Sequence, residues 1–534
     1  MRGLGGRVGL SAGAALLLVG AWFSPRAVPF NMDEFVHYHA LGCATASLSG
    51  HLPLIRDGCG HYDLSLPFTS TPLPLRSYAY IGSLPSLTFY PFWRVVRDPV
   101  AARIQGATFF LLWLWLAARL LRVRPVALVT ASLVFPVFLA TFVVDEGPVG
   151  LCALLFGGAL LGARRTIEAG GGRRAAAWAV LTGLLLFLGL WVKLVFAWWL
   201  PAFAAFALGE VRRPPASTGE GVRQHTGAIL AGLLALLLPT LVLLASTDRE
   251  GRPYAIAFRW SGVSAEAEAV EAVAIGLGRY AADASLVAPR NLALPSWPVD
   301  VLPALLSAAI LGLGLRRGTG RRREVAGWAV LCVLTFGLVA SSYHSRWPHH
   351  FAFPLLLLVL ALATALETLR PRARLAAATL AVVFWATLAV RLPAASSPTA
   401  SSAEKDQILA LVRASGLDRE SLQLHTSWGT YYIAQLFGDP VRLLVYMRGA
   451  PDDPVRLEEV RALAWALGRK VLLFSSRRWE RIQTPAVETT LGRPVRVWRR
   501  GTWWAVEYDP RGRDQGLRTC RGAELTSAER SRRP

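Results

Sequence analysis

The feature that most constrains the fold of this chain is a series of long apolar runs. A helix crosses the hydrocarbon core of a bilayer with roughly 17–25 apolar residues, and about eleven segments approach that length. They lie at about 8–23, 104–121, 125–144, 147–163, 176–192, 194–210, 226–246, 300–315, 325–342, 350–368 and 373–391. Only 17% of the residues are charged, against about 25% in soluble proteins. The sequence therefore predicts a polytopic α-helical membrane protein with about eleven transmembrane helices.

The basic residues are concentrated in the short loops between these runs. The net charge of +22 would by itself suit a protein that binds nucleic acid. Short basic loops, however, mark the cytoplasmic side of a membrane protein. One topology, with a cytoplasmic N-terminus, places on that side Arg2, Arg7, Arg119, Arg122, Arg124, Arg164, Arg165, Arg173, Arg174, Arg212, Arg213, Arg223, Arg316, Arg317, Arg321, Arg322, Arg323, Arg370, Arg372 and Arg374. We therefore expect a multi-pass protein of the bacterial plasma (inner) membrane and no nucleic-acid partner.

The composition changes after the last apolar run and divides the chain into domains. Residues 1–391 form the predicted transmembrane domain, with external loops at about 24–103 and 247–299. A Pro/Ala/Ser linker then leads to a predicted α/β domain, which ends at about residue 510. Short apolar segments at 441–446 and 470–474 predict strands, and 495–498 with 503–508 predict a hairpin. We expect residues 392–510 to be extracytoplasmic and residues 511–534 to be a disordered tail.

The first run and the cysteines each leave an alternative open. We expect run 8–23 to be a retained helix, because bulky Trp22 and Phe23 stand where a signal peptide needs small residues, but a cleaved signal peptide has a similar shape. Cys152 and Cys332 lie inside apolar runs and suit the core. Cys43 and Cys59 share an external loop and are candidates for a disulfide.

Polar and charged residues at the ends of the apolar runs form four patches on the external side. Charged groups at membrane depth cost roughly 2.5–3.5 kcal/mol, so they are expected at helix ends or where function holds them. The patches consist of Asp33 and Glu34, of Asp145 and Glu146, of Lys193, and of His344, Arg346, His349 and His350. Packing of the helices as a bundle would bring these patches together.

Such a group of residues suits the transfer of a group from a phosphorylated lipid. A carboxylate accepts the proton of the attacking hydroxyl or amine, and cations stabilise the departing phosphate. Simpler interpretations stay open: the carboxylates also suit helix starts, and Lys193 could extend to the interface. The sequence predicts no resident cofactor. The alternative is a divalent metal ion bound by His37 and His39.

Aromatic residues recur in the predicted C-terminal domain. They could form a platform for stacking on sugars, or an ordinary aromatic core, which we favour. They are Trp428, Tyr431, Tyr432, Trp498, Trp503 and Trp504.

The order of these motifs resembles that of the GT-C membrane glycosyltransferases, in particular the group of protein O-mannosyltransferases and lipid A aminoarabinose transferases (glycosyltransferase family 39-like). The matching segments are Met32-Asp33-Glu34-Phe35, Ala101-Ala102-Arg103-Ile104, Asp145-Glu146, Leu190-Trp191-Val192-Lys193 with Pro201, and Arg346-Trp347-Pro348-His349-His350-Phe351-Ala352-Phe353-Pro354. Two of them depart from the family pattern: Val192-Lys193-Leu194 replaces Thr-Lys-Gly, and the last segment has His where the family has other residues.

The resemblance implies an enzyme that transfers a hexosyl or pentosyl group, with inversion, from a polyprenyl-phosphate donor to a cell-envelope protein, lipid or glycan. It assigns catalysis to Asp33, Glu34 and Asp145. It assigns the donor phosphate to Lys193, Arg346, His349, His350 and Arg103, with secondary roles for Glu146 and His37. The alternatives are a transporter or flippase of lipid-linked glycan and a non-catalytic GT-C-like scaffold. The mostly apolar helix interiors count against a transporter.

Overall fold

A computed structural model describes the fold over most of the apolar runs and part of the C-terminal region. It covers residues 63–65, 72–78, 80–96, 100–134, 148–211, 221–245, 297–318, 320–342, 352–382, 407–408, 410–411, 421–426, 443–446, 453–466, 468–475 and 479–510. The described residues fall into two compact units. Residues 80–382 belong to the first unit, and residues 63–78 and 407–510 to the second.

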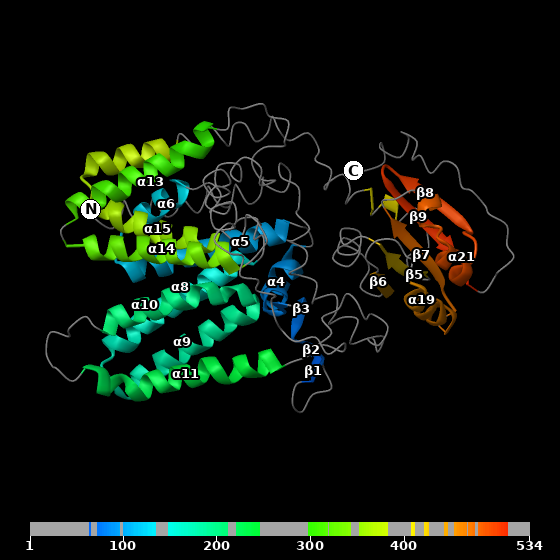
Figure 1. The fold of residues 1–534 in the computed structure, drawn as a ribbon, viewed down its shortest axis with the longest axis horizontal. Coiled ribbons are helices and arrows are strands. Elements are labelled where there is room, and N and C mark those ends of the chain that lie inside the picture. The colour runs from blue at the N-terminus through cyan, green and yellow to red at the C-terminus, as the bar shows by residue number, and fades with distance from the viewer. Residues whose placement is uncertain are drawn as a thin grey trace. The chain divides into compact units, whose positions relative to one another are not determined.

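The first unit is a bundle of apolar helices (Figure 1). A short strand, β4 (Ile81–Gly82), precedes them. The helices are α4 (Leu84–Val95), α5 (Val100–Leu121), α6 (Pro125–Val134), α8 (Val149–Glu168), α9 (Gly172–Val192), the 3-10 helix η2 (Leu194–Trp199), α10 (Leu200–Val211), α11 (Gly221–Ala245), α13 (Trp297–Arg317), α14 (Arg322–Ser342) and α15 (Ala352–Thr368), and residues 371–382 are also helical.

Five helical segments among the described residues are long and apolar enough to cross a membrane. They are Arg103–Leu121, Val149–Glu168, Gly172–Val192, Leu194–Val211 and His225–Ala245. The predicted polytopic helical fold is therefore confirmed, whereas the total of about eleven spans stays a prediction. The first run, 8–23, lies outside the described residues. The predicted run 194–210 corresponds to the segment Leu194–Val211, whose first turns are a 3-10 helix.

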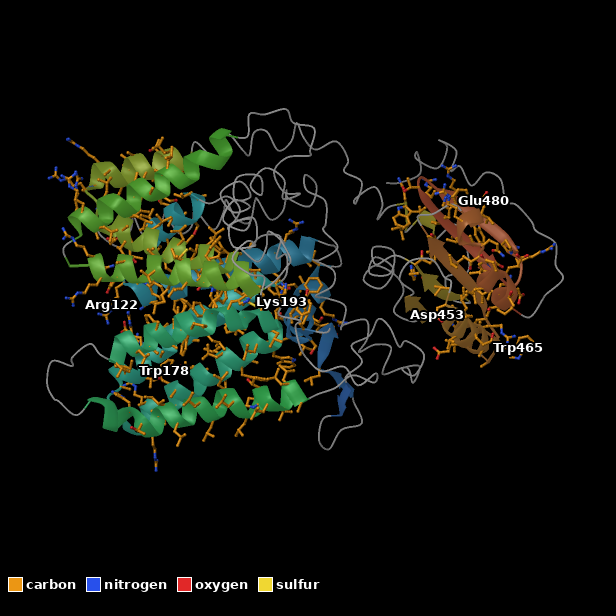
Figure 2. All side chains as sticks on the ribbon, viewed as in Figure 1. Arg122, Trp178, Lys193, Asp453, Trp465 and Glu480 are labelled. Atoms are coloured by element: carbon orange, nitrogen blue, oxygen red, sulfur yellow. The ribbon has the colours of Figure 1, made fainter. Side chains whose placement is uncertain are left out.

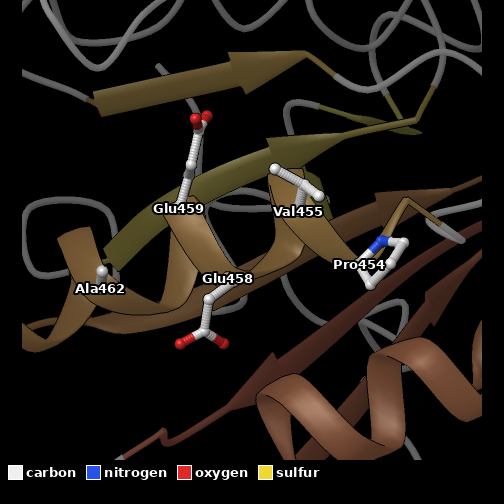
Figure 3. A pocket seen from close by; sticks show the side chains of 5 residues that line it. All are labelled: Pro454, Val455, Glu458, Glu459 and Ala462. Carbon is white, nitrogen blue, oxygen red and sulfur yellow. The ribbon is translucent and has the colours of Figure 1, made fainter.

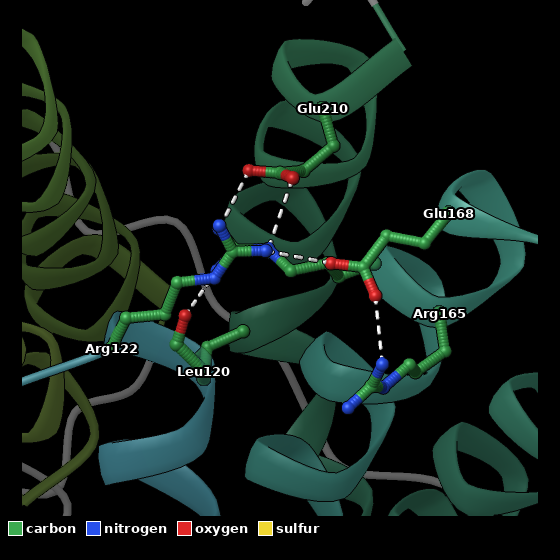
Figure 4. A network of polar contacts seen from close by, with 6 residues as sticks. Leu120, Arg122, Arg165, Glu168 and Glu210 are labelled. Atoms are coloured by element: carbon green, nitrogen blue, oxygen red, sulfur yellow. Dashed lines mark hydrogen bonds and ion pairs between the residues drawn. The ribbon is translucent and has the colours of Figure 1, made fainter. Parts of the chain in front are cut away.

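The arginine-rich loops meet at one end of the bundle, where ion pairs join distant helices. Arg164 Nη2 lies 2.8 Å from Glu210 Oε1, and both side chains are nearly buried. Arg164 also donates to the Leu120 carbonyl, so this guanidinium ties α5, α8 and α10 together. Arg122 and Glu168 pair at 2.9 Å (Figure 4), and Arg124 and Glu367 pair at 3.0 Å.

Small residues allow α9 and α11 to pack closely. A Cβ added to Gly183 would lie 2.1 Å from the Gly232 carbonyl oxygen. A Cβ on Gly232 would lie 2.8 Å from the Ala179 carbonyl oxygen. Close backbone approach through small residues is a common way for transmembrane helices to associate. The outer side of α11 exposes large apolar residues, including Leu238, Leu241 and Val242, as expected for a lipid-facing surface.

The second unit contains a five-stranded mixed sheet in the order β6-β5-β7-β9-β8. The strands are β5 (Ser421–His425), β6 (Leu443–Tyr446), β7 (Lys470–Ser475), β8 (Arg496–Arg500) and β9 (Trp503–Tyr508). β5 pairs in parallel with β6 and β7, and β9 pairs antiparallel with β7 and β8. The predicted hairpin is thus confirmed. The domain limits at 392 and 510 stay predictions.

Helices cover one face of this sheet. They are α19 (Pro454–Ala466), α20 (Trp479–Ile482) and α21 (Pro485–Leu491). The core beneath them joins Leu457 and Val487 to Leu424, Leu473 and Val506 of the strands. Short strands β1 (Asp63–Ser65) and β2 (Pro72–Pro74) pair antiparallel, and β3 (Arg76–Tyr78) follows.

The aromatic residues of the second unit contribute mainly to its core. Trp498 and Trp503 are 7% and 6% exposed and pack in one cluster with Phe474. Trp504 is half-buried, with the Arg499 guanidinium 5.2 Å from its ring centroid. These three residues therefore fit the aromatic core, and Trp428, Tyr431 and Tyr432 lie outside the described residues.

Candidate functional site

Lys193 interrupts two apolar helices at the end of the bundle opposite to Arg122 (Figure 2). α9 ends at Val192, Lys193 adopts an extended conformation (φ −159°, ψ 128°), and η2 begins at Leu194. The extended residue forms an antiparallel bridge with Ile81, and the Leu194 amide donates to the Tyr80 carbonyl at 2.9 Å. The backbone groups released by the break are thus partly satisfied by the β4 segment, as an apolar environment requires.

Two glycines allow this close arrangement. A Cβ on Gly82 would lie 1.7 Å from the Trp191 carbonyl oxygen. A Cβ on Gly189 would lie 2.4 Å from the Phe196 ring. Any larger residue would push β4, or the chain after the break, away from the end of α9. The position of Lys193 therefore depends on two neighbours that carry no side chain.

The Lys193 side chain is enclosed by protein. It is only 2% exposed, which excludes the interpretation that it extends to the interface. Its Nζ lies 5.8 Å from the centroid of the Tyr80 ring, within the range of a cation–π interaction. Lys193 also follows the last residue of α9, where the negative end of the helix dipole favours a cation.

Arg103 is the second predicted site residue that the structure describes. It is 0% exposed, near the start of α5. Gln105, two residues later, is also buried, and its Nε2 lies 3.4 Å from Thr88 Oγ1 of α4. A guanidinium can pair with an anionic group such as a phosphate, so Arg103 stays a candidate for the donor-phosphate site.

α5 and α8 run side by side in a register that relates Arg103 to the second acidic patch. The Arg164 guanidinium donates a hydrogen bond to the carbonyl of Leu120, 44 residues earlier. Gly157 contacts Trp113, which also lies 44 residues earlier: a Cβ added to Gly157 would lie 3.2 Å from the indole Cδ1. Continued toward the start of α5, this register puts Arg103 about level with the first turn of α8. Asp145 and Glu146 precede that turn in the sequence.

An aromatic cluster joins the element that follows Lys193 to α8 and α15. Trp199 stacks on Phe156 of α8 with ring centroids 4.6 Å apart. Its indole nitrogen donates to the carbonyl of Phe353, the second residue of α15, at 2.9 Å. The Trp198 and Phe353 rings meet edge to face. Residues 346–350, part of the last polar patch, precede α15 in the sequence. The start of α15 contacts the aromatic cluster that follows Lys193.

The other predicted site residues lie outside the described residues, and their roles stay predictions. They are Asp33, Glu34, His37, His39, Cys43, Cys59, Asp145, Glu146, His344, Arg346, His349 and His350. Within the described ranges, no group of three or more His, Cys, Asp or Glu side chains is suited to hold a metal ion. Cys152 and Cys332 form no disulfide in the part of the chain that the structure describes, and Cys152 is fully buried.

Sequence reasoning missed Tyr80 and the buried polar residues of the following segment. Ser83 and Ser86 are both 0% exposed. Tyr90 and Val95 of α4, by contrast, are exposed. Gly82 could have indicated that this segment packs closely against another part of the backbone, because an isolated glycine beside an apolar segment often marks close backbone contact.

The second unit contains a shallow pocket remote in sequence from the predicted site residues. Its volume is about 520 Å³, and α19 supplies its lining (Figure 3): Pro454, Val455, Glu458, Glu459 and Ala462. Arg461 pairs with Glu458 on the same helix. This pocket lacks the cations that a phosphate group requires among its lining residues, so the Lys193 region is the better candidate site.

Comparison with solved structures identifies the class of fold. The chain has the GT-C fold of polytopic membrane proteins. The structure of ArnT (lipid A aminoarabinose transferase) from Cupriavidus metallidurans in the apo state matches with a TM-score of 0.59 and 13% identity, over 97% of this chain and 100% of ArnT. ArnT bound to undecaprenyl phosphate matches with a TM-score of 0.58 and 11% identity, over 93% and 97% of the two chains.

A weaker match is the oligosaccharyltransferase AglB of Archaeoglobus fulgidus in complex with an inhibitory peptide and a dolichol-phosphate. Its TM-score is 0.43 with 12% identity, over 88% of this chain and 69% of AglB. No protein-family model matches the sequence. No curated protein sequence matches it either.

Proposed function

We propose that this protein is a membrane glycosyltransferase that transfers a sugar from a polyprenyl-phosphate donor to a cell-envelope acceptor. The observation that carries the proposal is the enclosed ammonium of Lys193 at a break between apolar helices of a GT-C fold. A buried cation at the end of a membrane bundle is costly unless function holds it there. ArnT, whose fold this chain shares, binds undecaprenyl phosphate.

The arrangement of charge supports an extracytoplasmic site. Ion pairs of Arg122, Arg124 and Arg164 join helices at one end of the bundle, and short basic loops face the cytoplasm. Lys193 then lies on the opposite, extracytoplasmic side of the bacterial plasma membrane. Asp33, Asp145 and Arg346 follow or precede apolar runs on that same side of the predicted topology.

The proposed reaction inverts the anomeric carbon in a single displacement. The acceptor oxygen or nitrogen attacks that carbon and forms the new glycosidic bond, while the bond from carbon to the phosphate oxygen breaks. The acceptor proton passes to the Asp33 carboxylate, which Glu34 and Asp145 help to position. The electron pair leaves on the polyprenyl phosphate, where Lys193, Arg103, Arg346, His349 and His350 stabilise the negative charge.

The test replaces the proposed base without changing its size. In a strain that lacks the protein, wild-type protein or Asp33→Asn is expressed at equal membrane levels, and envelope proteins, lipids and glycans are compared by mass spectrometry. We expect Asp33→Asn to lower product at least a hundredfold, because a positioned base contributes about 10²–10⁴-fold. Asp57→Asn, in the same predicted loop, is the control and should restore product. Full product with Asp33→Asn would remove Asp33 from catalysis.

A further inference from the structure

The ring of Tyr80 is the described aromatic partner of the Lys193 ammonium. Their separation is 5.8 Å from Nζ to ring centroid. The two residues come from distant parts of the sequence but are held together by backbone contacts. The Tyr80 carbonyl accepts from the Leu194 amide at 2.9 Å, and Ile81 forms a bridge with Lys193. The ring therefore belongs to a segment fixed directly against the helix break.

An aromatic ring can hold a buried ammonium without neutralising it. The ring offers the negative face of its quadrupole to the ammonium. This contact restricts the movement of the Lys193 side chain. A lysine held in this way, at 2% exposure, is placed for contact with an anionic group.

We propose that Tyr80 is a positioning residue that holds the Lys193 ammonium in place for the phosphate of the lipid donor and so sets the affinity for that phosphate. The inference rests on the proposed function, because it takes the Lys193 region as the donor-phosphate site. The tyrosine acts through its ring. Its hydroxyl group is not needed for this role, so phenylalanine should replace it.

The experiment measures how tightly the purified full-length protein in lipid nanodiscs binds undecaprenyl phosphate. A desolvated cation–π contact is worth about 2 kcal/mol, which corresponds to about thirtyfold in affinity. We expect Tyr80→Leu to weaken binding by about ten- to thirtyfold and Tyr80→Phe to stay within about twofold of wild type. Undecaprenol, which has no phosphate, should bind all variants equally, and a purely structural defect would change its binding too.

Tyr90→Leu is the matched control. Tyr90 lies on the neighbouring helix α4, is 47% exposed, and has its own cation, Arg94, at 5.9 Å from the ring centroid. Its replacement should leave undecaprenyl phosphate binding unchanged. Equal weakening by Tyr80→Leu and Tyr90→Leu would overturn the inference, and so would equal weakening by Tyr80→Leu and Tyr80→Phe.

Lys193→Met separates this inference from the function on which it rests. If Lys193→Met weakens phosphate binding and Tyr80→Leu does not, the donor site stands and the role of Tyr80 is wrong. If Lys193→Met binds undecaprenyl phosphate as wild type does, the assignment of Lys193 to the donor phosphate fails. In that case any effect of Tyr80→Leu has another cause, and the inference fails with it.

Discussion

Among single residues, Lys193 shows best what a sequence can and cannot reveal. Its place between two apolar runs predicted a charge at a helix end, and the structure confirms the break there. Its burial was not predictable, because it depends on contacts with distant segments, such as those with Tyr80 and Ile81. Periodicity and charge patterns report local preference, whereas a contact between distant segments depends on the packing of the whole bundle.

The ion pair between Arg164 and Glu210 makes a prediction at the scale of residues. Their side chains are 11% and 9% exposed, and removing one partner of a buried pair costs roughly 3–5 kcal/mol. Glu210→Gln should therefore clearly lower the thermal unfolding temperature of the purified protein. Glu168→Gln is the control, because its partners Arg122 and Arg165 are 71% and 48% exposed and exposed pairs contribute about 0–1 kcal/mol each. Equal losses from both variants would contradict the buried role of Arg164.

Among the elements, the helices were largely predictable and their interruptions were not. Uncharged apolar runs gave the positions of α5, α8, α9 and α11 closely. The 3-10 turns of η2 were missed, because Leu194–Trp199 reads as apolar helix and only the tertiary contacts of Trp198 and Trp199 distinguish it. Strands β7 and β9 were recognisable from their apolar residues.

The packing of α9 on α11 makes a prediction at the scale of elements. Gly183→Ala places a methyl group 2.1 Å from the Gly232 carbonyl oxygen, so the helices must separate, at a cost of about 1–3 kcal/mol. Gly227→Ala, on α11, meets nothing within 4 Å and should stabilise the helix by up to about 1 kcal/mol. Thermal unfolding of the two variants in the same detergent should shift in opposite directions. A stable Gly183→Ala protein would show that this helix contact is looser than described.

For the whole molecule, charge distribution gave the most information. The alternation of arginine-rich and arginine-poor loops predicted which helix ends lie together, and the described ion pairs at one end agree with it. The shared site could be predicted only as an order of motifs. Described contacts bring α8, η2 and α15 together through Phe156, Trp199 and Phe353. The roles of Asp33 and Arg346 stay predictions, because both lie outside the described residues.

The proposed topology makes a prediction at the same scale. A single cysteine at Ser217, in an arginine-rich loop, should be labelled by a membrane-impermeant maleimide only after the cells are opened. A single cysteine at Ser285, in the predicted external loop, should be labelled in intact cells. The background for both is a variant without native cysteines that still inserts. Labelling of Ser217→Cys in intact cells would reverse the orientation and place Lys193 in the cytoplasm.

The most direct test of the central claim is a measurement of donor and product in the same cells. Polyprenyl-phosphate sugars and envelope acceptors are quantified by mass spectrometry with and without the protein. The proposed transferase predicts that, without the protein, one acceptor loses the mass of a single sugar while the corresponding polyprenyl-phosphate sugar accumulates. Unchanged acceptors, with no lipid-linked sugar accumulating, would contradict transfer by this protein.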